Sequence, residues 1–459
     1  MNHFFAIKRG EIGDRLDASY FASGNWLELS KFPISIIGRH FDVRDGDHSR
    51  LPSEELSTPE EGVRYLRAQD LCEGEIISDD PIYISHRYFA KIERSHIKPG
   101  DLLFSVMASI GNSAIVPDDF PPTTANRAVG ILSPLTQNKI LTWYLFYLFS
   151  TELGEQLYTR IKKGGLQRRT NLADVEALEF PLPPTAKQEE LVTAMDKARS
   201  QRKQKLAEAD TLLSSLDNYL LTTLGLNRFG EDDRNVFAIQ NFSINRRLDP
   251  HFHAPSFKQI SRLLSTTTTV PIGSIVGFSK ETWKPEEDEK STFRYIEISN
   301  VRPETGEATW VEIPVKEAPS RARMVVQEDD IIVSLTRPHH GSIAHLSGEF
   351  DGCIASTGFA VIRYVSKLVN REYLWCILRS QLCLQQMLQR SSGGNYPAII
   401  KSELENVVVP IPEISIQETI VSEVQRRRRE ARNLRSEAEI EWQAAKQWFE
   451  EQLLGSAPL

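Results

Sequence analysis

The sequence predicts a mixed α/β (α+β) protein in which one unit, a domain followed by a long helix, is written twice. Two long stretches lack internal helix breakers and carry apolar residues at helical spacing, from Lys187 to Leu224 and again after Pro412. The lead-in to the first stretch returns in the second, because Pro181 and Gln188 recur as Pro410 and Gln417, both 229 positions later. Short apolar strands and a shorter helix precede each long stretch, which favours a compact mixed domain before each helix.

The first long helix follows a proline-rich segment that begins at Phe180. Proline fixes the backbone and forbids a helix there, and Gly225 is a typical C-terminal stop. A helix of this size is about 55–60 Å long at 1.5 Å per residue. Its apolar stripe has to be covered by another element for the helix to persist in water. The stripe contains Leu191, Met195, Ala198, Leu206, Leu212, Leu213, Leu216, Tyr219, Leu220 and Leu224.

The second long helix, towards the C-terminal end of the sequence, supplies that cover. Two helices with matching lead-ins can pair as an antiparallel coiled coil with a pseudo-twofold axis. The helix length would then act as a ruler between two domains, and one turn of B-DNA is about 34–36 Å. Two unrelated surface helices are the alternative, but the repeat continues upstream of both helices.

Matching pairs upstream support a tandem duplication. Arg64-Tyr65-Leu66 returns as Arg294-Tyr295-Ile296, and Asp101 of PGDLLFS returns as Asp330 of DDIIVS. A helix is expected over Ile140–Leu157 in the first copy and over Arg371–Gln389 in the second. A Gly-Gly loop follows each of these helices. The predicted boundaries are a first domain over 1–179, a first long helix over 180–226, a second domain over 227–409 and a second long helix over 410–459.

Composition narrows the class of protein. A net charge of −8 argues against a protein that simply coats nucleic acid, although local patches matter more than totals. There is no signal-peptide pattern and no apolar run long enough to span a bilayer. The four cysteines lack CxxC spacing and are expected to be reduced core residues of a cytoplasmic protein.

The two tails carry a family resemblance. FPLPPTAKQEELV (180–192) and VVPIPEISIQETIV (408–421), each preceded by a Gly-Gly loop, resemble the specificity subunit of type I restriction-modification systems. The resemblance implies two target recognition domains that each read one half of a bipartite DNA site. It also implies paired helices that bind two methyltransferase subunits, with restriction subunits joining them. S-adenosylmethionine, Mg and ATP would be bound by those partners and not by this chain.

The candidate DNA-binding residues lie in the Gly-Gly loops and in loops at strand ends. Glycine allows a close backbone approach, cations neutralise phosphates, and Gln, Asn or Arg can read base edges. A solvated basic loop is the alternative for the first set. The candidates are Lys162, Lys163, Gln167, Arg168 and Arg169 in the first Gly-Gly loop, Arg390, Asn395 and Tyr396 around the second, and Asn126, Arg127, Arg337, His339 and His340 in strand-end loops.

Other patterns favour structural roles. The run Arg426–Arg429 is expected on a solvated helix face or against an acidic partner, and Trp442, Trp448 and Phe449 either in the coiled-coil core or in partner docking. No P-loop, GxGxxG or adenine-methyltransferase motif is present, and the histidines lack a completed metal-ligand spacing. The chain is therefore expected to be a non-catalytic recognition subunit. A specificity subunit of a type II bipartite or other phage-defence methyltransferase, and a coiled-coil protein scaffold, are the alternatives.

Overall fold

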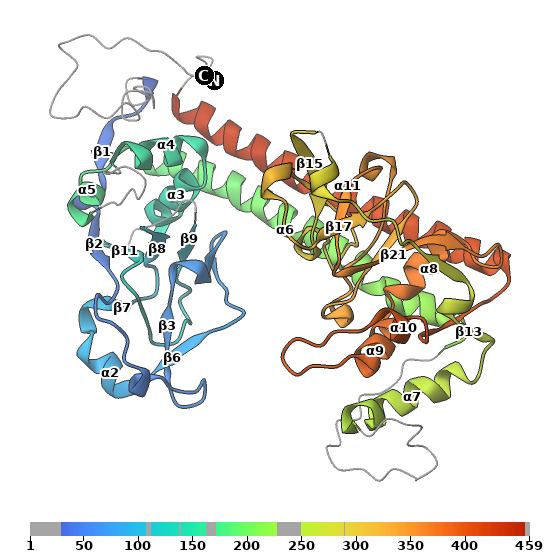
Figure 1. Cartoon of the computed structure of the whole chain (residues 1–459). Helices are drawn as coiled ribbons and strands as arrows, with labels where there is room; N and C mark the ends of the chain where they lie inside the picture. The colour runs from blue at the N-terminus through green and yellow to red at the C-terminus, as the bar shows by residue number, and fades with distance from the viewer. Residues whose placement is uncertain are drawn as a thin grey trace. The chain divides into compact units, whose positions relative to one another are not determined.

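The computed structural model describes residues 29–106, 112–136, 139–161, 171–226, 249–288 and 290–454. The chain divides into two compact units (Figure 1). Unit 1 contains Met1–Lys205 and Ser436–Leu459, and unit 2 contains Leu206–Arg435. Each unit therefore holds one half of each long helix.

Unit 1 is built on two four-stranded sheets. The first sheet is antiparallel, with strand order β2-β11-β8-β9, and the second has order β6-β3-β10-β7, in which β3 and β10 are parallel. A small antiparallel pair, β1-β12, precedes the long helix. The bounds are β1 Ile34–Ile36, β2 Phe41–Asp45, β3 Val63–Leu66, β6 Ile82–Ile84, β7 His96–Ile97, β8 Leu102–Ser105, β9 Ser113–Ile115, β10 Thr123–Ala125, β11 Val129–Pro134 and β12 Glu179–Pro181, with β4 Leu71–Cys72 and β5 Glu75–Ile76 forming a separate hairpin.

Unit 2 repeats the two four-stranded sheets and the small pair with the same strand order, and the β4-β5 hairpin has no counterpart among its described sheets. Its sheets have orders β14-β21-β18-β19 and β16-β15-β20-β17, its one parallel pair is β15-β20, and its small pair is β13-β22. The bounds are β13 Thr269–Pro271, β14 Val276–Phe278, β15 Thr292–Ile296, β16 Val311–Pro314, β17 Ala322–Val325, β18 Ile331–Ser334, β19 Ile343–His345, β20 Ile354–Ser356, β21 Phe359–Val365 and β22 Val408–Pro410. The predicted duplication and the mixed α/β class are confirmed.

The alternation of side chains along the central strands produces a layered core. In β8, Leu102 and Phe104 join the cluster that contains the helices, whereas Leu103 joins the cluster shared with the second sheet. In β18, Val333 faces the helices and Ile332 faces the second sheet. Strand side chains alternate between faces, so a fully apolar strand with both faces buried lies between two layers.

The short helices that follow each sheet differ from the sequence prediction. The helix expected over Ile140–Leu157 is two helices, and so is the one expected over Arg371–Gln389. The first pair is α3 (Lys139–Phe149) and α4 (Glu152–Ile161), and the second is α8 (Arg371–Leu378) and α9 (Gln381–Arg390). Gly154 allows the first break, since a Cβ there would lie 2.1 Å from the Leu148 carbonyl oxygen.

Both breaks create a helix N-terminus that a long helix caps. The Leu153 N–H donates to Glu450 Oε1 at 2.7 Å in unit 1, and the Gln381 N–H donates to Asp217 Oδ1 at 2.9 Å in unit 2. A carboxylate at a helix N-terminus satisfies a free N–H and complements the helix dipole. The caps come from residues that are distant in sequence, so helical periodicity alone could not reveal them.

The long helices are α6 (Thr185–Thr223) and α11 (Ile414–Leu454), and they pair antiparallel within each unit. In unit 1, Lys187 contacts Gln452 at 3.0 Å, while Lys205 pairs with Glu441 at 2.7 Å. In unit 2, Asp210 pairs with Arg435 at 2.7 Å, and Arg427 donates to Ser215 at 2.8 Å. The predicted antiparallel coiled coil is confirmed in each unit taken by itself.

The repeated Pro and Gln of the lead-ins have a structural role. Gln417 is fully buried, accepts the Asn370 N–H at 2.8 Å and donates to the carbonyls of Leu368 and Pro412 at 3.1 and 2.8 Å. Gln188 donates in the same way to Pro183 at 2.8 Å. The glutamine therefore ties the extended proline segment, which has few backbone donors of its own, to the first turn of the long helix.

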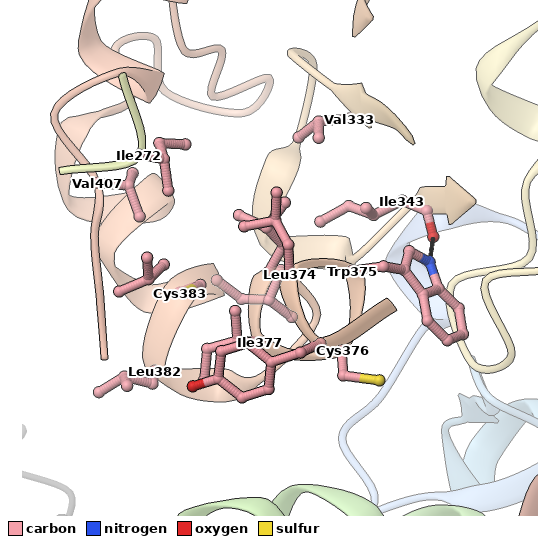
Figure 2. Packing of buried hydrophobic residues seen from close by; sticks show 14 of the residues in the cluster. Ile272, Val333, Ile343, Leu374, Trp375, Cys376, Ile377, Leu382, Cys383 and Val407 are labelled. Atoms are coloured by element: carbon pink, nitrogen blue, oxygen red, sulfur yellow. Dashed lines mark hydrogen bonds between the residues drawn. The ribbon is translucent and has the colours of Figure 1, made fainter. Parts of the chain in front are cut away.

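The aromatic residues of α11 belong to the core of unit 1. Phe449 is fully buried and stacks on Tyr144 with ring centroids 5.7 Å apart, and Trp442 and Trp448 pack around the same cluster. In unit 2 the core is centred on α8 and α9, where the Trp375 indole N–H donates to the Ile343 carbonyl at 3.2 Å (Figure 2). Phe449 is therefore a core residue, while Trp442 and Trp448 are partly buried and their docking of a partner stays a prediction.

The cysteines depart in part from expectation. Cys353, Cys376 and Cys383 are buried and unpaired, as predicted, but Cys72 is exposed. Cys72 is the last residue of β4, which pairs with β5 in a hairpin whose strands have two residues each. One face of β4 is open to solvent. Within the described ranges, none of the helices is long and apolar enough to cross a membrane.

Candidate nucleic-acid interface

The most basic candidate loop lies outside the described residues. Lys162, Lys163, Gln167, Arg168 and Arg169 all fall between α4 and α5 (Leu172–Glu176), in the range 162–170. The geometry of the candidate site is therefore described for the equivalent loop in unit 2.

The second Gly-Gly loop is a narrow, exposed hairpin. Ser392 and Ala398 exchange two backbone hydrogen bonds of 2.8 Å, which close the loop at its base. Gly393 has φ 99°, a conformation that favours glycine, and a Cβ there would lie 2.9 Å from the Tyr396 carbonyl oxygen. Tyr396 at the tip is 70% exposed. The loop therefore presents a large aromatic face to solvent.

Arg337 lies against this tip. Its N–H donates to the Pro397 carbonyl at 2.7 Å, and its guanidinium carbon lies 4.3 Å from the centre of the Tyr396 ring. One Nη also approaches the Asn395 carbonyl at 3.4 Å. Arg337 has φ 46°, in the left-handed region, a strained conformation that occurs often at functional sites. The structure thus brings three of the predicted residues, Arg337, Asn395 and Tyr396, into one cluster.

Three chain segments meet at Leu335, two residues before Arg337. The Leu335 N–H donates to the Gly358 carbonyl, and the Leu335 carbonyl accepts from Ile399, both at 2.8 Å. The end of β18, the β20–β21 turn and the Gly-Gly loop are therefore held side by side. In the β20–β21 turn, the Thr357 N–H donates to the carbonyl of Arg321, an exposed cation that the sequence analysis missed.

Unit 1 has the corresponding junction. The Val106 N–H donates to the Ala128 carbonyl at 3.0 Å, which places the β10–β11 turn beside the end of β8. That turn carries Asn126 and Arg127. Asn126 Oδ1 accepts the Ala128 N–H at 3.0 Å, so its side chain shapes the turn, whereas the Arg127 side chain is exposed. Of these two candidates, Arg127 is the one free to approach a ligand.

The remaining candidates have other surroundings. Arg390 pairs with Glu403 at 3.2 Å, which neutralises its charge. His339 and His340 lie in the short turn η13 (Pro338–His340), with ring centroids 4.5 Å apart. Burial, followed by the positive charges of His340 and Arg337, lowers the pKa of His339. These surroundings favour the neutral form of the His339 imidazole. These two histidines line a cavity on the helix side of the turn.

The chain contains two copies of one module. Each copy consists of a pair of sheets with loops at the strand ends and is followed by one of the two paired helices. This arrangement defines a duplicated recognition module. The chain belongs to the type I restriction modification DNA specificity domain family, whose model matches residues 42–208 and again 265–441. The two matches together cover most of the chain and fall once in each repeat.

Two curated relatives have the same character. A stretch of 131 residues is 28% identical to the type I restriction enzyme HindI specificity subunit of Haemophilus influenzae, and it covers 28% of this chain and 26% of that protein. Another stretch of 160 residues is 26% identical to the type I restriction enzyme EcoBI specificity subunit of Escherichia coli, over 35% of this chain and 32% of that protein. The matches therefore span about a quarter to a third of each relative.

Solved structures resemble the chain over nearly its whole length. One belongs to a study of complex assembly and conformational transition of the type I R-M system, with 18% identity, a TM-score of 0.49 and coverage of 92% of this chain and 97% of that one. Another is the S subunit of a type I restriction-modification system from M. genitalium, with 14% identity, a TM-score of 0.42 and coverage of 94% and 97%.

Proposed function

We propose that this chain is the DNA-specificity subunit of a type I restriction-modification enzyme and that it selects a bipartite DNA site. The observation that carries the proposal is the repetition of the same three sheets and one long helix in a chain of the specificity-domain family. Residues 1–179 and 227–409 would each read one half of the site. Residues 180–226 and 410–459 would form the spacer between the two domains.

The loops at the strand ends would provide the DNA contacts. Support comes from unit 2, where the β18 end, the β20–β21 turn and the Gly-Gly loop converge and present Arg337 stacked on Tyr396. A guanidinium placed over an aromatic ring by a cation–π contact can still direct N–H groups toward guanine O6 and N7 or toward phosphate. Lys162, Lys163, Gln167, Arg168 and Arg169 would take the corresponding position in the first half, together with Arg127.

The chemistry would belong to partner subunits. Two methyltransferase subunits would dock on the paired helices, and restriction subunits would join the assembly. S-adenosylmethionine, Mg²⁺ and ATP would be bound by those subunits. This chain would contribute recognition alone, with specificity from base contacts and affinity largely from phosphate contacts.

Methylation mapping in cells tests this proposal. The neighbouring methyltransferase is expressed with and without this chain, and methylated positions are mapped across the genome. The expected result is a split motif, two short defined sequences separated by a gap, that is methylated only when the chain is present. A map that is identical in both strains would contradict the proposal and favour the protein-scaffold alternative. The type II bipartite or related alternative predicts the same split motif, and co-purification of a restriction subunit with the assembled complex separates it from a type I enzyme.

A further inference from the structure

A cavity in unit 2 is lined by His339 and His340 of η13, the turn that Arg337 precedes. Its volume is about 350 Å³, and its walls come from both long helices, from α8, from the start of α9 and from η13. A smaller cavity of about 170 Å³ adjoins the same helices, and Leu213 and Arg428 line both. Together they have the size of a small-molecule site.

Arg428 is a partly buried cation without a carboxylate partner. Its guanidinium carbon lies 4.4 Å from the centre of the Trp375 ring, and no ion pair joins it to a carboxylate within the described ranges. The neighbouring Arg426 and Arg427 differ, since both pair with Glu423, at 2.7 and 2.6 Å. Burial is the main cause that lowers the pKa of Arg428, and the negative charges of Glu307 and Glu372 oppose the shift without forming an ion pair with the guanidinium.

A second guanidinium contacts the same indole ring. The guanidinium carbon of Arg379 lies 5.3 Å from the Trp375 ring centre, and its nitrogens donate to the carbonyls of Pro303, Glu304 and Ile343 at 2.9, 3.0 and 3.2 Å. Carbonyl oxygens satisfy its hydrogen bonds but do not cancel its charge. Burial accordingly lowers the pKa of Arg379 to about 10.

The rest of the wall combines apolar side chains of α6, α9 and α11 with a few polar groups. His339 Nδ1 is buried and has no hydrogen-bond partner. The acidic residues that line the two cavities are Asp217, which caps α9 at 2.9 Å, the exposed Glu304, and Glu307 in the smaller cavity, where Arg302, Arg432 and Arg435 add further positive charge. Two unmatched guanidiniums and one unsatisfied imidazole nitrogen make the cavity suited to an anion.

In the first repeat, residues of the same unit contact the arginine that is equivalent to Arg428 and balance its charge. Arg199 corresponds to Arg428 at the offset of 229, and it lies 3.8 Å from Glu75 and donates to the Glu73 carbonyl at 3.0 Å. The position of Arg379 is occupied there by Ser150. Among the residues that the structure describes, the paired guanidiniums therefore occur once per chain.

We propose that this cavity binds one small molecule that carries a terminal phosphate, with Arg428 as the bidentate donor and Trp375 as its support. Two unmatched positive charges are balanced by a dianion. A terminal phosphate carries close to two negative charges at neutral pH, whereas a phosphodiester of the DNA backbone carries one. Occupancy would be one ligand per chain, even where two copies of a partner bind the paired helices.

Calorimetric titration of the full chain with pyrophosphate tests the proposal, against sodium chloride at matched ionic strength. Saturable binding with a stoichiometry near one is expected. Arg428→Met should weaken the affinity at least tenfold. Arg428→Lys keeps the charge but loses the planar fork, so its affinity should lie between those of the unmodified chain and Arg428→Met. Arg429→Met removes the same charge from the adjacent exposed position and should bind as the unmodified chain does.

Three results would overturn the proposal. The first is no saturable binding above the chloride control. The second is an equal loss in Arg429→Met and Arg428→Met, which would indicate general charge screening. The third is an Arg428-dependent loss of duplex DNA binding without any pyrophosphate binding, which would assign the cation to a backbone phosphate. The thermal midpoint of each variant without ligand shows whether Arg428→Met has lost its fold, and Arg428→Lys then carries the test.

Discussion

Arg337 shows what single residues contribute and what the sequence could predict about them. Its type and its position in a strand-end loop identified it as a candidate. Its left-handed backbone and its stacking on Tyr396, 59 positions later, depend on long-range packing. The same limit hid the role of Arg428, which the run of four arginines assigned to a solvated surface, although the structure places it against Trp375.

Replacing Arg337 tests the candidate interface in the second half. Arg337→Ala should weaken binding of the specific duplex by about 1–3 kcal/mol, roughly fivefold to 150-fold, because one base or phosphate contact is lost. Arg337→Lys should restore little, since lysine lacks the planar fork that stacks on Tyr396. Gel shift with the assembled complex measures both. Arg426→Ala is the control, because Arg426 is paired on the surface of α11 with Glu423 and Glu430; an equal loss there would argue against a local contact.

Gln417 offers a stability test of the lead-in motif. Gln417→Ala removes a fully buried side chain and leaves the Asn370 N–H and two carbonyls without their partner. A loss of about 1–3 kcal/mol in the free energy of unfolding is expected. Chemical denaturation measures it, with Glu418→Ala at the adjacent exposed position as the comparison. An unchanged midpoint would mean that the motif has no structural role.

At the scale of elements, the long helices were predictable and the short ones were only partly so. The absence of helix breakers and the apolar spacing are local signals, and they give α6 and α11 nearly to the residue. The breaks before α4 and α9 depend on capping carboxylates from distant parts of the chain. Glu450 lies 297 positions from the Leu153 N–H that it accepts, and Asp217 lies 164 positions from the Gln381 N–H. Helical periodicity contains no information on such contacts.

Glu450 makes the stability of unit 1 depend on pH. Burial raises its pKa above the ordinary value of 4.5, so the folded chain holds this proton more tightly than the unfolded chain. The contribution of Glu450 to stability is therefore present below that value and is lost as the pH rises through the folded pKa. Glu450→Gln retains an acceptor for the Leu153 N–H and removes the buried charge.

We expect Glu450→Gln to be at least as stable as the original chain at pH 8 and to lose the downward slope above pH 4.5. Urea unfolding at several pH values measures this, with the exposed Glu451→Gln as the control. A variant that is less stable than the original at pH 8, with the slope unchanged, would contradict the assignment.

Phe449 tests the packing of α11 in unit 1. Phe449→Ala empties a fully buried position against Tyr144, and a loss of about 3–5 kcal/mol in the free energy of unfolding is expected. Ile440→Ala on the same helix removes a side chain that is 65% exposed and should change stability by less than about 0.5 kcal/mol. Equal effects of the two substitutions would contradict the observed helix packing.

At the scale of the whole molecule, the duplication is the feature that the sequence predicted most completely. Offsets near 229 persist through both copies, and the two units have the same strand order in all three sheets of the repeat. The repeats keep their buried ties, such as Tyr144 to Pro181 at 2.7 Å and Tyr373 to Pro410 at 2.9 Å. They differ in sequence at the Gly-Gly loops, where Ser391-Ser392 of the second copy correspond to Lys162-Lys163 of the first. Two domains that recognise two different half-sites are expected to share a core and to differ in their loops.

The central claim is that each copy reads its own half of a split DNA site. Exchange of residues 1–179 for the corresponding domain of a relative with a known, different target tests it directly. The methylated motif is then mapped in cells that supply the methyltransferase. We predict that one half of the motif changes to that of the donor, while the other half and its orientation stay the same. A change in both halves, or in neither, would contradict independent reading by two domains.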